Sequence, residues 1–540
     1  MTQTIDRFLV VLLGSLLFIP FLGAVHLFDW DELNFAEAAR EMLVTGDWLN
    51  VTINFEPFYE KPPFFIWLQA LSMSLFGVSE FAARFPNAVC GIITLLVIYN
   101  FGFELKGRRF AWIWVGLYTA SLLPHFYFKS GIIDPWFNLF IFLAVWQLFD
   151  FFNHHSNNIR LKPWVLSGLF LGLAILTKGP VALIVWSLVA FFLLLSHGFR
   201  KFPGVLEVLA FVSVLLVVGG SWFGAQWASG NSAVVWEFLR VQKELFSMGV
   251  AGHEQPFYYH TLVLLIGCFP ASFLALPVFF SRLHPSGQER ILLFGMKVFL
   301  LVVLVLFSIV KTKIVHYSSL TYYAITFLAA YMVVEWDRLK STAWIKTVGV
   351  ILLATVSAAL VLIPLLDKYK EKWLPWESMD AFTRANLMVD PGWEGWEWTL
   401  GLVYFVLGFW FINKLSKSIA KLLVISTVVV NMFILIYPAR IERITQNGAV
   451  SLYKSLSGKQ VYIKPLYMKS YGYLFYSKYP NHASKLKSND HWLMTGDIDK
   501  DAYFILRNKD LKNLDTLANG VRTVEERGGY VLLRRAKSEN

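Results

Sequence analysis

Several lysines of this sequence stand at the edges of apolar segments, where charged side chains are costly. Lys61 follows Glu60 in "YEKPPF", and Lys178 lies in "LTKGP". The full set of such cations is Lys61, Lys129, Lys178, Lys311 and Lys313. A single lysine of this kind could simply extend along apolar surface to a lipid headgroup. Taken together, the set indicates a cationic pocket at a membrane surface, suited to a phosphate carried on a lipid.

Acidic residues accompany these cations. Asp29, Asp31 and Glu32 open the stretch "DWDELNFAEAAREML", directly after an apolar run. Asp29 and Glu32 could form a capping box, with Asp29 as the N-cap and Glu32 reaching back. That interpretation leaves Asp31 without a structural task, so Asp31 is the candidate general base. Asp134 in "IIDPW" could cap a helix that has proline at its first position, could belong to the site, or could do both.

Histidines add a further set of candidate ligands. His253 in "GHEQPFYYH" could share a divalent metal ion with Glu60, although two ligands fall short of the roughly four of a closed site. His316 and Tyr317 follow the Lys311–Lys313 pair in "KTKIVHY" and could bind phosphate oxygens. The alternatives are a structural hydrogen bond for each histidine and aromatic packing for Tyr317.

The elements that hold these residues are those of an integral membrane protein. The chain has 540 residues, of which 56% are hydrophobic and only 16% charged, against about 25% charged in soluble domains. The net charge of +11 is spread over short loops and does not indicate nucleic-acid binding. Cys90 and Cys268 lie in apolar runs, which argues against a disulfide or a cysteine metal site. The first apolar run lacks a small-residue cleavage site, so we expect a retained span.

Hydropathy predicts about thirteen transmembrane segments. They cover roughly residues 8–28, 87–103, 110–127, 135–152, 163–177, 180–197, 204–222, 258–280, 291–310, 315–334, 343–365, 398–413 and 419–437. Every second loop is basic, which places those loops and the N-terminus inside. With an odd number of spans the C-terminus and the "DWDEL" stretch lie outside.

The outer segments have their own patterns. Residues 31–43, 61–77 and 231–246 are predicted to be helices lying along the interface, and residues 367–398 form a tryptophan-rich loop at the headgroups. From residue 438 the composition changes to that of a small α/β domain, with strands expected at "QVYIKPL", "DAYFILRN" and "GGYVLLRR" and helices at "AVSLYKSLS" and "SYGYLFYSKY". We therefore predict a membrane domain over 1–437 and an accessory outer domain over 438–540.

Five motifs together carry a resemblance to a known family. They are "DWDELNFAEAAREML", "FYEKPPFFIWLQALSMSLFG", "SEFAARFPNAV", "TKGPVALI" and "HEQPFYYH". The chain resembles bacterial membrane glycosyltransferases of the GT-C fold, in particular lipid A 4-amino-4-deoxy-L-arabinose transferases and the related protein O-mannosyltransferase-like group. The resemblance covers roughly residues 5–340 and extends in architecture to the C-terminal domain. It implies a donor sugar carried on a polyprenyl phosphate and an acceptor on the outer face.

The resemblance also implies roles for individual residues. Asp31 matches the family's catalytic carboxylate, and Asp134 a second carboxylate of the catalytic pocket. The donor phosphate would be bound by Lys61, Lys178, Lys311, Lys313, His316 and Tyr317. Glu60 and His253 match the positions of a metal site, for zinc or for magnesium or manganese. Asn34 departs from the family, which typically has arginine three residues after the catalytic aspartate, so the specificity for aminoarabinose is in doubt.

One base and one leaving-group pocket predict a single displacement with inversion at the anomeric carbon. The favoured acceptor is lipid A or a related envelope glycolipid; a protein Ser/Thr, a polysaccharide or a teichoic-type polymer are alternatives. A lipid-linked sugar transporter is the alternative from another class, but its ionisable groups would lie near the midplane. A binding scaffold would leave the charges of the first loop unexplained. The expected setting is a monomer among the lipids of a bacterial inner membrane, with its active site on the periplasmic side.

Overall fold

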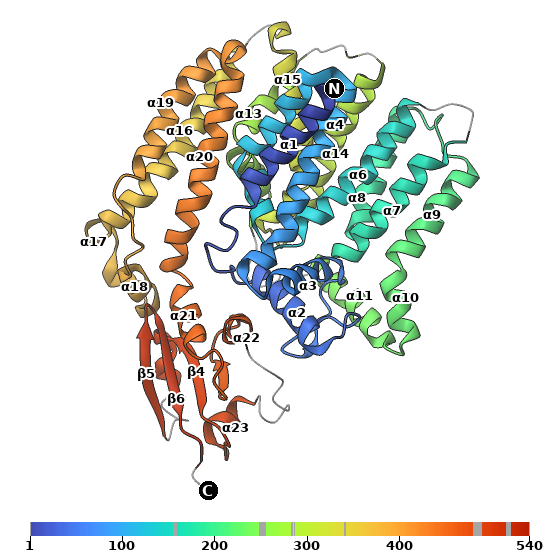
Figure 1. The fold of residues 1–540 in the computed structure, drawn as a ribbon. Coiled ribbons are helices and arrows are strands. Elements are labelled where there is room, and N and C mark those ends of the chain that lie inside the picture. Colours follow the sequence, from blue (N-terminus) through green and yellow to red (C-terminus); the bar gives the residue numbers. More distant parts are fainter. Residues whose placement is uncertain are drawn as a thin grey trace.

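The protein is a bundle of long helices with a small sheet domain attached at one end (Figure 1). The computed structural model describes residues 2–154, 159–247, 255–281, 285, 287–339, 342–478, 489–514 and 520–538. The N-terminus lies at the end of the bundle that faces away from the sheet domain, and the C-terminus lies beyond that domain (Figure 1). This arrangement agrees with the prediction that the two termini are on opposite sides of a membrane.

Helices occupy all of the predicted spans. The bundle consists of α1 (Thr2–Phe18), α4 (Glu80–Ala120), α6 (Asp134–Asn153), α7 (Leu161–Lys178), α8 (Val181–Ser196), α9 (Val205–Gly219), α10 (Ser221–Ala228), α12 (Tyr259–Gly267), α13 (Ala271–Ala275), α14 (Gly287–Ile309), α15 (Thr321–Val334), α16 (Ala343–Lys368), α19 (Trp398–Asn413) and α20 (Leu415–Arg443). Short elements join them: α5 (Leu122–Phe126), η1 (Tyr127–Lys129), η2 (Leu276–Phe279), η3 (Val315–Ser318), η4 (Trp336–Arg338), α17 (Lys370–Trp373), η5 (Trp376–Ser378) and α18 (Ala381–Met388).

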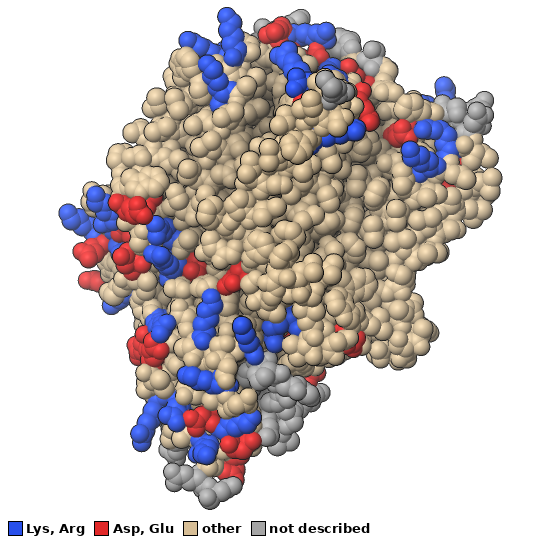
Figure 2. Space-filling view, viewed as in Figure 1, with Lys and Arg blue, Asp and Glu red and all other residues tan. Residues whose placement is uncertain are grey.

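The helices have the length and apolarity of a multi-pass membrane protein. Among the described residues, six are long and apolar enough to cross a bilayer, or up to eight if the bent pairs α9–α10 and α12–α13 each count as one span. The count of thirteen stays a prediction, although α4 joins two of its spans at Gly107, where φ is 78° and the helix breaks. Charged side chains gather toward the two ends and leave an almost uncharged band between them on the visible face (Figure 2).

Close helix contacts are made where the sequence has small residues. Helix α7 packs against α9, and a Cβ on Gly168 would lie 2.6 Å from the backbone oxygen of Phe211. Gly172, one turn later, faces Val218 and Gly219 at similar range. Small residues allow helix backbones to approach within a membrane, where dispersion forces rather than water drive the packing. The end of α7, which carries Lys178, is thereby fixed against its neighbour.

The first outer loop contains the helices α2 (Asp31–Thr45) and α3 (Phe64–Phe76) and the two-stranded hairpin β1 (Thr52–Ile53) and β2 (Glu56–Pro57). The predicted helices are confirmed, as is α11 (Ser232–Ser247) in the later loop. The position predicted for α2 is wrong, because α2 is buried from Glu32 to Met42 rather than lying on a surface. Its charged face is satisfied internally: Arg40 pairs with Glu37 at 2.6 Å, and Glu41 accepts a hydrogen bond from Thr52 at 2.7 Å.

The C-terminal domain covers α2. It begins after α20, which continues to Arg443 and so carries the predicted boundary at 437 inside a helix. The domain contains α21 (Asn447–Ser455), β3 (Tyr462–Pro465), α22 (Gly472–Ser477), α23 (Asp490–Thr495), β4 (Ala502–Arg507), η7 (Asn508–Asn513), β5 (Val521–Arg527) and β6 (Tyr530–Arg535). The sheet order is β3-β4-β6-β5, with β3 parallel to β4 and the other pairs antiparallel.

The three predicted strands and both predicted helices of this domain are confirmed, whereas β5 was not predicted. β5 lies at the edge of the sheet and has no buried residue. A strand without a buried face lacks the alternation of apolar and polar residues that identifies strands in a sequence. A shared apolar core joins α2 and α3 to α21, α22 and the sheet, so the first outer loop and the C-terminal domain pack as one layer.

Candidate active site

Five segments that are far apart in the sequence meet at the end of the bundle that faces the C-terminal domain. They are the start of α2, the loop before α3, the start of α6, the end of α7, and η3. They bring together six of the predicted site residues: Asp31, Lys61, Asp134, Lys178, His316 and Tyr317. The cluster combines two carboxylates, two lysines, an imidazole and a phenol.

Asp31 is the first residue of α2 and faces His316. Its Oδ2 lies 3.6 Å from His316 Nε2, and its side chain is 36% exposed. The capping-box interpretation of this stretch is wrong. Trp30 occupies the N-cap position without a side-chain hydrogen bond, and Glu32 accepts instead from the backbone N–H of Phe28 at 2.8 Å. Asp31 therefore keeps free acceptor capacity next to an imidazole, as a proton acceptor requires.

Glu32 is the partner of Arg84, a residue to which the sequence analysis gave no role. Arg84 binds both carboxylate oxygens of Glu32, at 2.9 Å and 2.7 Å. The remaining guanidinium hydrogens go to the carbonyls of Leu22, Val25 and His26 at 2.7 to 2.9 Å. Arg84 thereby fixes the chain between the end of α1 and the start of α2, using the bidentate geometry that arginine offers. A positive residue placed outside by the charge rule was the signal that could have revealed it.

Asp134 and Lys178 form a second ion pair, at 2.6 Å between Oδ1 and Nζ. Asp134 stands at the start of α6 without acting as its cap, since the N-cap position belongs to Ile133 and shows no side-chain hydrogen bond. Lys178 also lies 5.3 Å from the centre of the Tyr317 ring, in the range of a cation–π contact. Asn138, one turn into α6, donates to Ser319 Oγ at 2.7 Å and ties this pair to η3.

Lys61 completes the cationic side of the cluster. Its Nζ lies 3.9 Å from Glu60, and its side chain is 15% exposed. Burial lowers the pKa of Lys61, Glu60 opposes that shift, and the like charge of Lys178 adds to it. A lysine in this condition gains strongly from an arriving anion, which restores the stability of its charged form. The loop itself is held by Gln242, which donates to the Glu60 carbonyl at 3.0 Å.

Burial likewise shifts the pKa values of the η3 residues. It lowers the pKa of His316, while Asp134 and Asp31 act in the opposite direction. It raises the pKa of Tyr317, although Lys178 pulls it back. Both side chains are therefore neutral near neutral pH and can each donate one hydrogen bond into the cluster.

Three other lysines of the predicted set lie apart from these contacts. Lys313 donates to the Val310 carbonyl at 2.8 Å, just beyond the end of α14, and Lys311 is exposed. Lys129 donates to the carbonyls of Leu17 and Pro20 at 2.9 Å and 2.8 Å, and burial lowers its pKa to about 8. These contacts match the structural alternatives for Lys313 and Lys129 better than a role in binding an anion.

The predicted metal site is only half described. Glu60 is 42% exposed at the rim of the cluster, whereas His253 lies outside the described residues. Within the described ranges, no group of three His, Cys, Asp or Glu side chains could hold a metal ion. The donors present around Glu60 do not fit a metal centre.

A cavity of about 420 Å³ leads to the cluster from the side of the bundle. Its walls are mainly apolar and come from the exit of α1, from α5, and from Ile434, Leu435 and Pro438 of α20. His316 and Arg84 are among the few polar residues that line it. An apolar passage that ends at charged groups suits a ligand with a hydrocarbon chain and a polar head.

Comparison with known proteins relates this architecture to sugar transfer. The family described as dolichyl-phosphate-mannose-protein mannosyltransferase matches residues 60–222. Over its whole length the chain superposes on ArnT from Cupriavidus metallidurans bound to undecaprenyl phosphate, with a TM-score of 0.77, 18% sequence identity, and coverage of 98% of this chain and 97% of that chain. The chain has the GT-C fold. The apo state of the same protein gives a TM-score of 0.76.

Curated relatives support the same resemblance in sequence. The undecaprenyl phosphate-alpha-4-amino-4-deoxy-L-arabinose arabinosyl transferase of Shewanella sediminis is 28% identical over 310 residues, which are 57% of this chain and 56% of that protein. The protein of the same name from Pectobacterium carotovorum is 29% identical over 320 residues, 57% of this chain and 55% of its own. The matched region thus spans little more than half the length of these relatives. The resemblance to GT-C glycosyltransferases is confirmed.

Proposed function

We propose that this protein is a membrane glycosyltransferase that moves a sugar from a polyprenyl phosphate to an acceptor. The observation that carries the proposal is the apolar cavity that ends at His316, beside Asp31, Lys61 and Lys178. A polyprenyl chain would lie against the apolar walls, and its phosphate would reach the cations. The names of the curated relatives, which act on an undecaprenyl phosphate sugar, support this donor class.

The leaving phosphate is the group that the cluster stabilises. Negative charge develops on the phosphate oxygen as the bond to the anomeric carbon breaks. Lys61 and Lys178 supply fixed positive charge at that point, and His316 and Tyr317 supply hydrogen bonds. Preorganised donors of this kind lower the barrier without reorganising during the reaction. Lys311 and Lys313 lie on the same loop as His316, and their part in phosphate binding stays a prediction.

Asp31 is proposed as the general base. It accepts the proton of the acceptor oxygen as that oxygen attacks the anomeric carbon from the face opposite the phosphate, which inverts the configuration. Asp134 is paired with Lys178 and keeps that lysine charged and oriented, so it acts on the site through its partner. Glu60 and the described residues near it do not complete a zinc, magnesium or manganese site, so each step here is carried by side chains.

The acceptor is proposed to be lipid A or a related envelope glycolipid on the periplasmic face of a bacterial inner membrane, with the protein acting as a monomer. Asn34 is buried in α2, where its amide can bind Trp30 through the ring N–H at 2.8 Å and the carbonyl at 3.1 Å. It is therefore engaged with its own turn rather than with a substrate. This supports a sugar other than that of the arabinosyl transferases.

The proposal is tested by transfer from labelled undecaprenyl-phosphate sugars to cell-envelope fractions. The purified protein, its Asp31→Asn variant and a control, Asp490→Asn, would be compared; Asp490 lies on the C-terminal domain and its side chain is 57% exposed. Label in glycolipid with the unchanged protein and the control, but not with Asp31→Asn, is expected. Label in protein or polysaccharide would replace the acceptor class. Failure with every donor, together with donor movement across sealed vesicles, would favour a transporter.

A further inference from the structure

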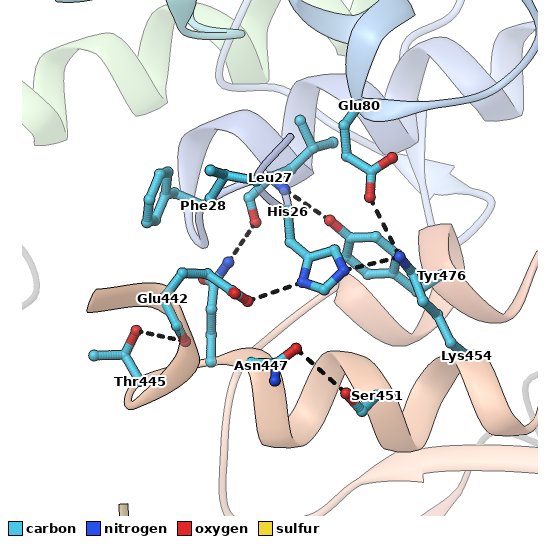
Figure 3. Close-up of polar contacts among 12 residues, drawn as sticks. His26, Leu27, Phe28, Glu80, Glu442, Thr445, Asn447, Ser451, Lys454 and Tyr476 are labelled. Atoms are coloured by element: carbon cyan, nitrogen blue, oxygen red, sulfur yellow. Dashed lines mark hydrogen bonds and ion pairs between the residues drawn. The ribbon is translucent and has the colours of Figure 1, made fainter. Parts of the chain in front are cut away.

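The five residues before Asp31 are held by the C-terminal domain. Leu27 donates its backbone N–H to the Tyr476 hydroxyl at 2.7 Å, a contact between residues 449 positions apart (Figure 3). Gln446 donates to the Leu27 carbonyl at 2.8 Å, and its side-chain oxygen accepts from the Asp29 N–H at 3.2 Å. The Gln446 amide thus pairs with the backbone on both sides of Phe28, as a neighbouring β-strand would.

Side chains extend this grip at both ends of the segment. His26 Nδ1 lies 2.9 Å from Glu442, and its Nε2 lies 2.8 Å from Lys454 Nζ, which also reaches Glu80 at 3.5 Å (Figure 3). At the other end, the Trp30 ring packs against Tyr471 with centroids 5.6 Å apart. The C-terminal domain therefore contacts residues 26 to 30 along their whole length.

This segment has no regular structure that would fix it from within. It lies between the end of α1 and the start of α2, and neither a helix nor a sheet supplies partners for its backbone groups. Buried backbone N–H and C=O groups need partners. Here they come from Arg84 on one side, which binds the carbonyls of Val25 and His26, and from Gln446 and Tyr476 on the other. The last hydrogen bond from the C-terminal domain falls on Asp29, two residues before Asp31.

We propose that the C-terminal domain is a positioning element of the active site, in which Gln446 and Tyr476 set the place of the Asp31 carboxylate. This inference rests on the proposed transfer reaction. The donor pocket is formed by Lys61, Lys178 and η3, which belong to the membrane domain, so loosening residues 27–29 moves the base and leaves donor binding in place. A displacement of about 1 Å at a reacting group can cost about a hundredfold in rate.

The test compares Gln446→Leu and Tyr476→Phe with a matched control, Tyr462→Phe. The Tyr462 hydroxyl donates to Asp499 at 2.7 Å, also in the C-terminal domain but away from residues 26–30. We expect kcat to fall about tenfold to a hundredfold in Gln446→Leu, and by less in Tyr476→Phe. KM for the donor should stay unchanged, and the control should match the unaltered protein. Equal kcat values in all four proteins, or a rise in KM alone, would overturn the inference.

A pH profile separates positioning from simple loss of packing. In Gln446→Glu the side chain keeps its size, but as a carboxylate it cannot donate to the Leu27 carbonyl. When protonated at lower pH it can donate again and still accept from the Asp29 N–H. The activity of this variant, relative to the unaltered protein, should therefore recover as the pH falls. A constant ratio across the pH range contradicts the role assigned to the Gln446 amide.

Hydrogen exchange keeps this inference distinct from the proposed function. Exchange at the Leu27 and Asp29 amides should quicken at least tenfold in Gln446→Leu, and at Leu27 in Tyr476→Phe, while amides of α7 and of the sheet keep their rates. If the unaltered protein transfers no sugar, the proposed function fails and the exchange data still decide whether the C-terminal domain holds this segment. Unchanged exchange at both amides would overturn it.

Discussion

Asp31 and Glu32 are neighbours in the sequence and opposite in every physical respect. Glu32 is 5% exposed, and Arg84 and the backbone of Phe28 and Gly131 saturate its oxygens. Asp31 is 36% exposed, and its nearest partner atom in an ion pair is 3.6 Å away, on His316. The difference teaches that saturation, rather than charge or position, separates a structural carboxylate from a reactive one. A carboxylate whose lone pairs are all engaged cannot accept a proton from a substrate.

The largest expected effect is on the reactive member of this pair. Asp31→Asn should reduce kcat by about 10²- to 10⁴-fold, because a general base contributes a factor of this size. The melting temperature should stay within a few degrees, since Asp31 makes no close hydrogen bond that stabilises the fold. Steady-state transfer rates and thermal unfolding in detergent measure the two quantities. An active Asp31→Asn protein would end the contrast.

Removing the partner of the saturated carboxylate should affect stability first. Arg84→Met leaves Glu32 buried without its countercharge, which costs about 3–5 kcal/mol in comparable buried pairs. Less folded protein and a lower melting temperature are expected. Arg240→Met is the matched control, because Arg240 pairs with Glu237 on the surface and is 64% exposed. If both variants melt alike, the Glu32–Arg84 clamp is not a stabilising element.

The cations of the site should affect binding rather than stability. Lys61→Gln removes one charged hydrogen bond to the donor phosphate, worth about 1.5–3 kcal/mol. The Kd for an undecaprenyl phosphate should rise roughly tenfold to a hundredfold. Lys311→Gln serves as the comparison, because Lys311 is exposed and no contact joins it to the cluster. A larger effect at Lys311 than at Lys61 would reassign the phosphate site to the later loop.

Donor affinity should decrease as the pH rises. Burial lowers the pKa of Lys61 and of His316 in the free protein, and a bound phosphate favours the protonated form of each. Above the free-protein pKa, binding must therefore take up a proton, which weakens affinity by at most about tenfold per pH unit for one group. Titration calorimetry at several pH values measures this slope. Lys61→Gln should flatten it at alkaline pH, and an unchanged slope would exclude Lys61.

The sequence predicted the residues that lie in short, distinctive motifs. Asp31, Lys61, Lys178 and His316 were identified because each is a charged or titratable side chain at the edge of an apolar segment. The helices were predictable for the same reason, since hydrophobic runs of membrane length have few alternatives. The roles of these residues remain predictions, while their proximity is now a property of the fold.

Residues whose importance depends on distant partners could not be predicted. Arg84 lies in "SEFAARFPNAV", where nothing local shows that it will bind Glu32, 52 residues away. The surface position predicted for α2 failed because its cover comes from residues beyond 440. Gln446 and Tyr476 have ordinary sequence surroundings, and only the packing of the C-terminal domain gives them a task. Periodicity describes a helix in isolation and is silent on what packs against it.

The contact between Leu27 and Tyr476 also sets a schedule for the ribosome. Residues 449 positions apart are synthesised about 20 to 90 seconds apart at 5–20 residues per second. Throughout that interval the first outer loop stands without its cover, next to a bilayer already occupied by lipid-linked sugars. A nascent chain therefore holds the charged residues of the site long before it holds the lid of α2. Completion of translation, rather than insertion of the first helices, is the event that finishes the catalytic face.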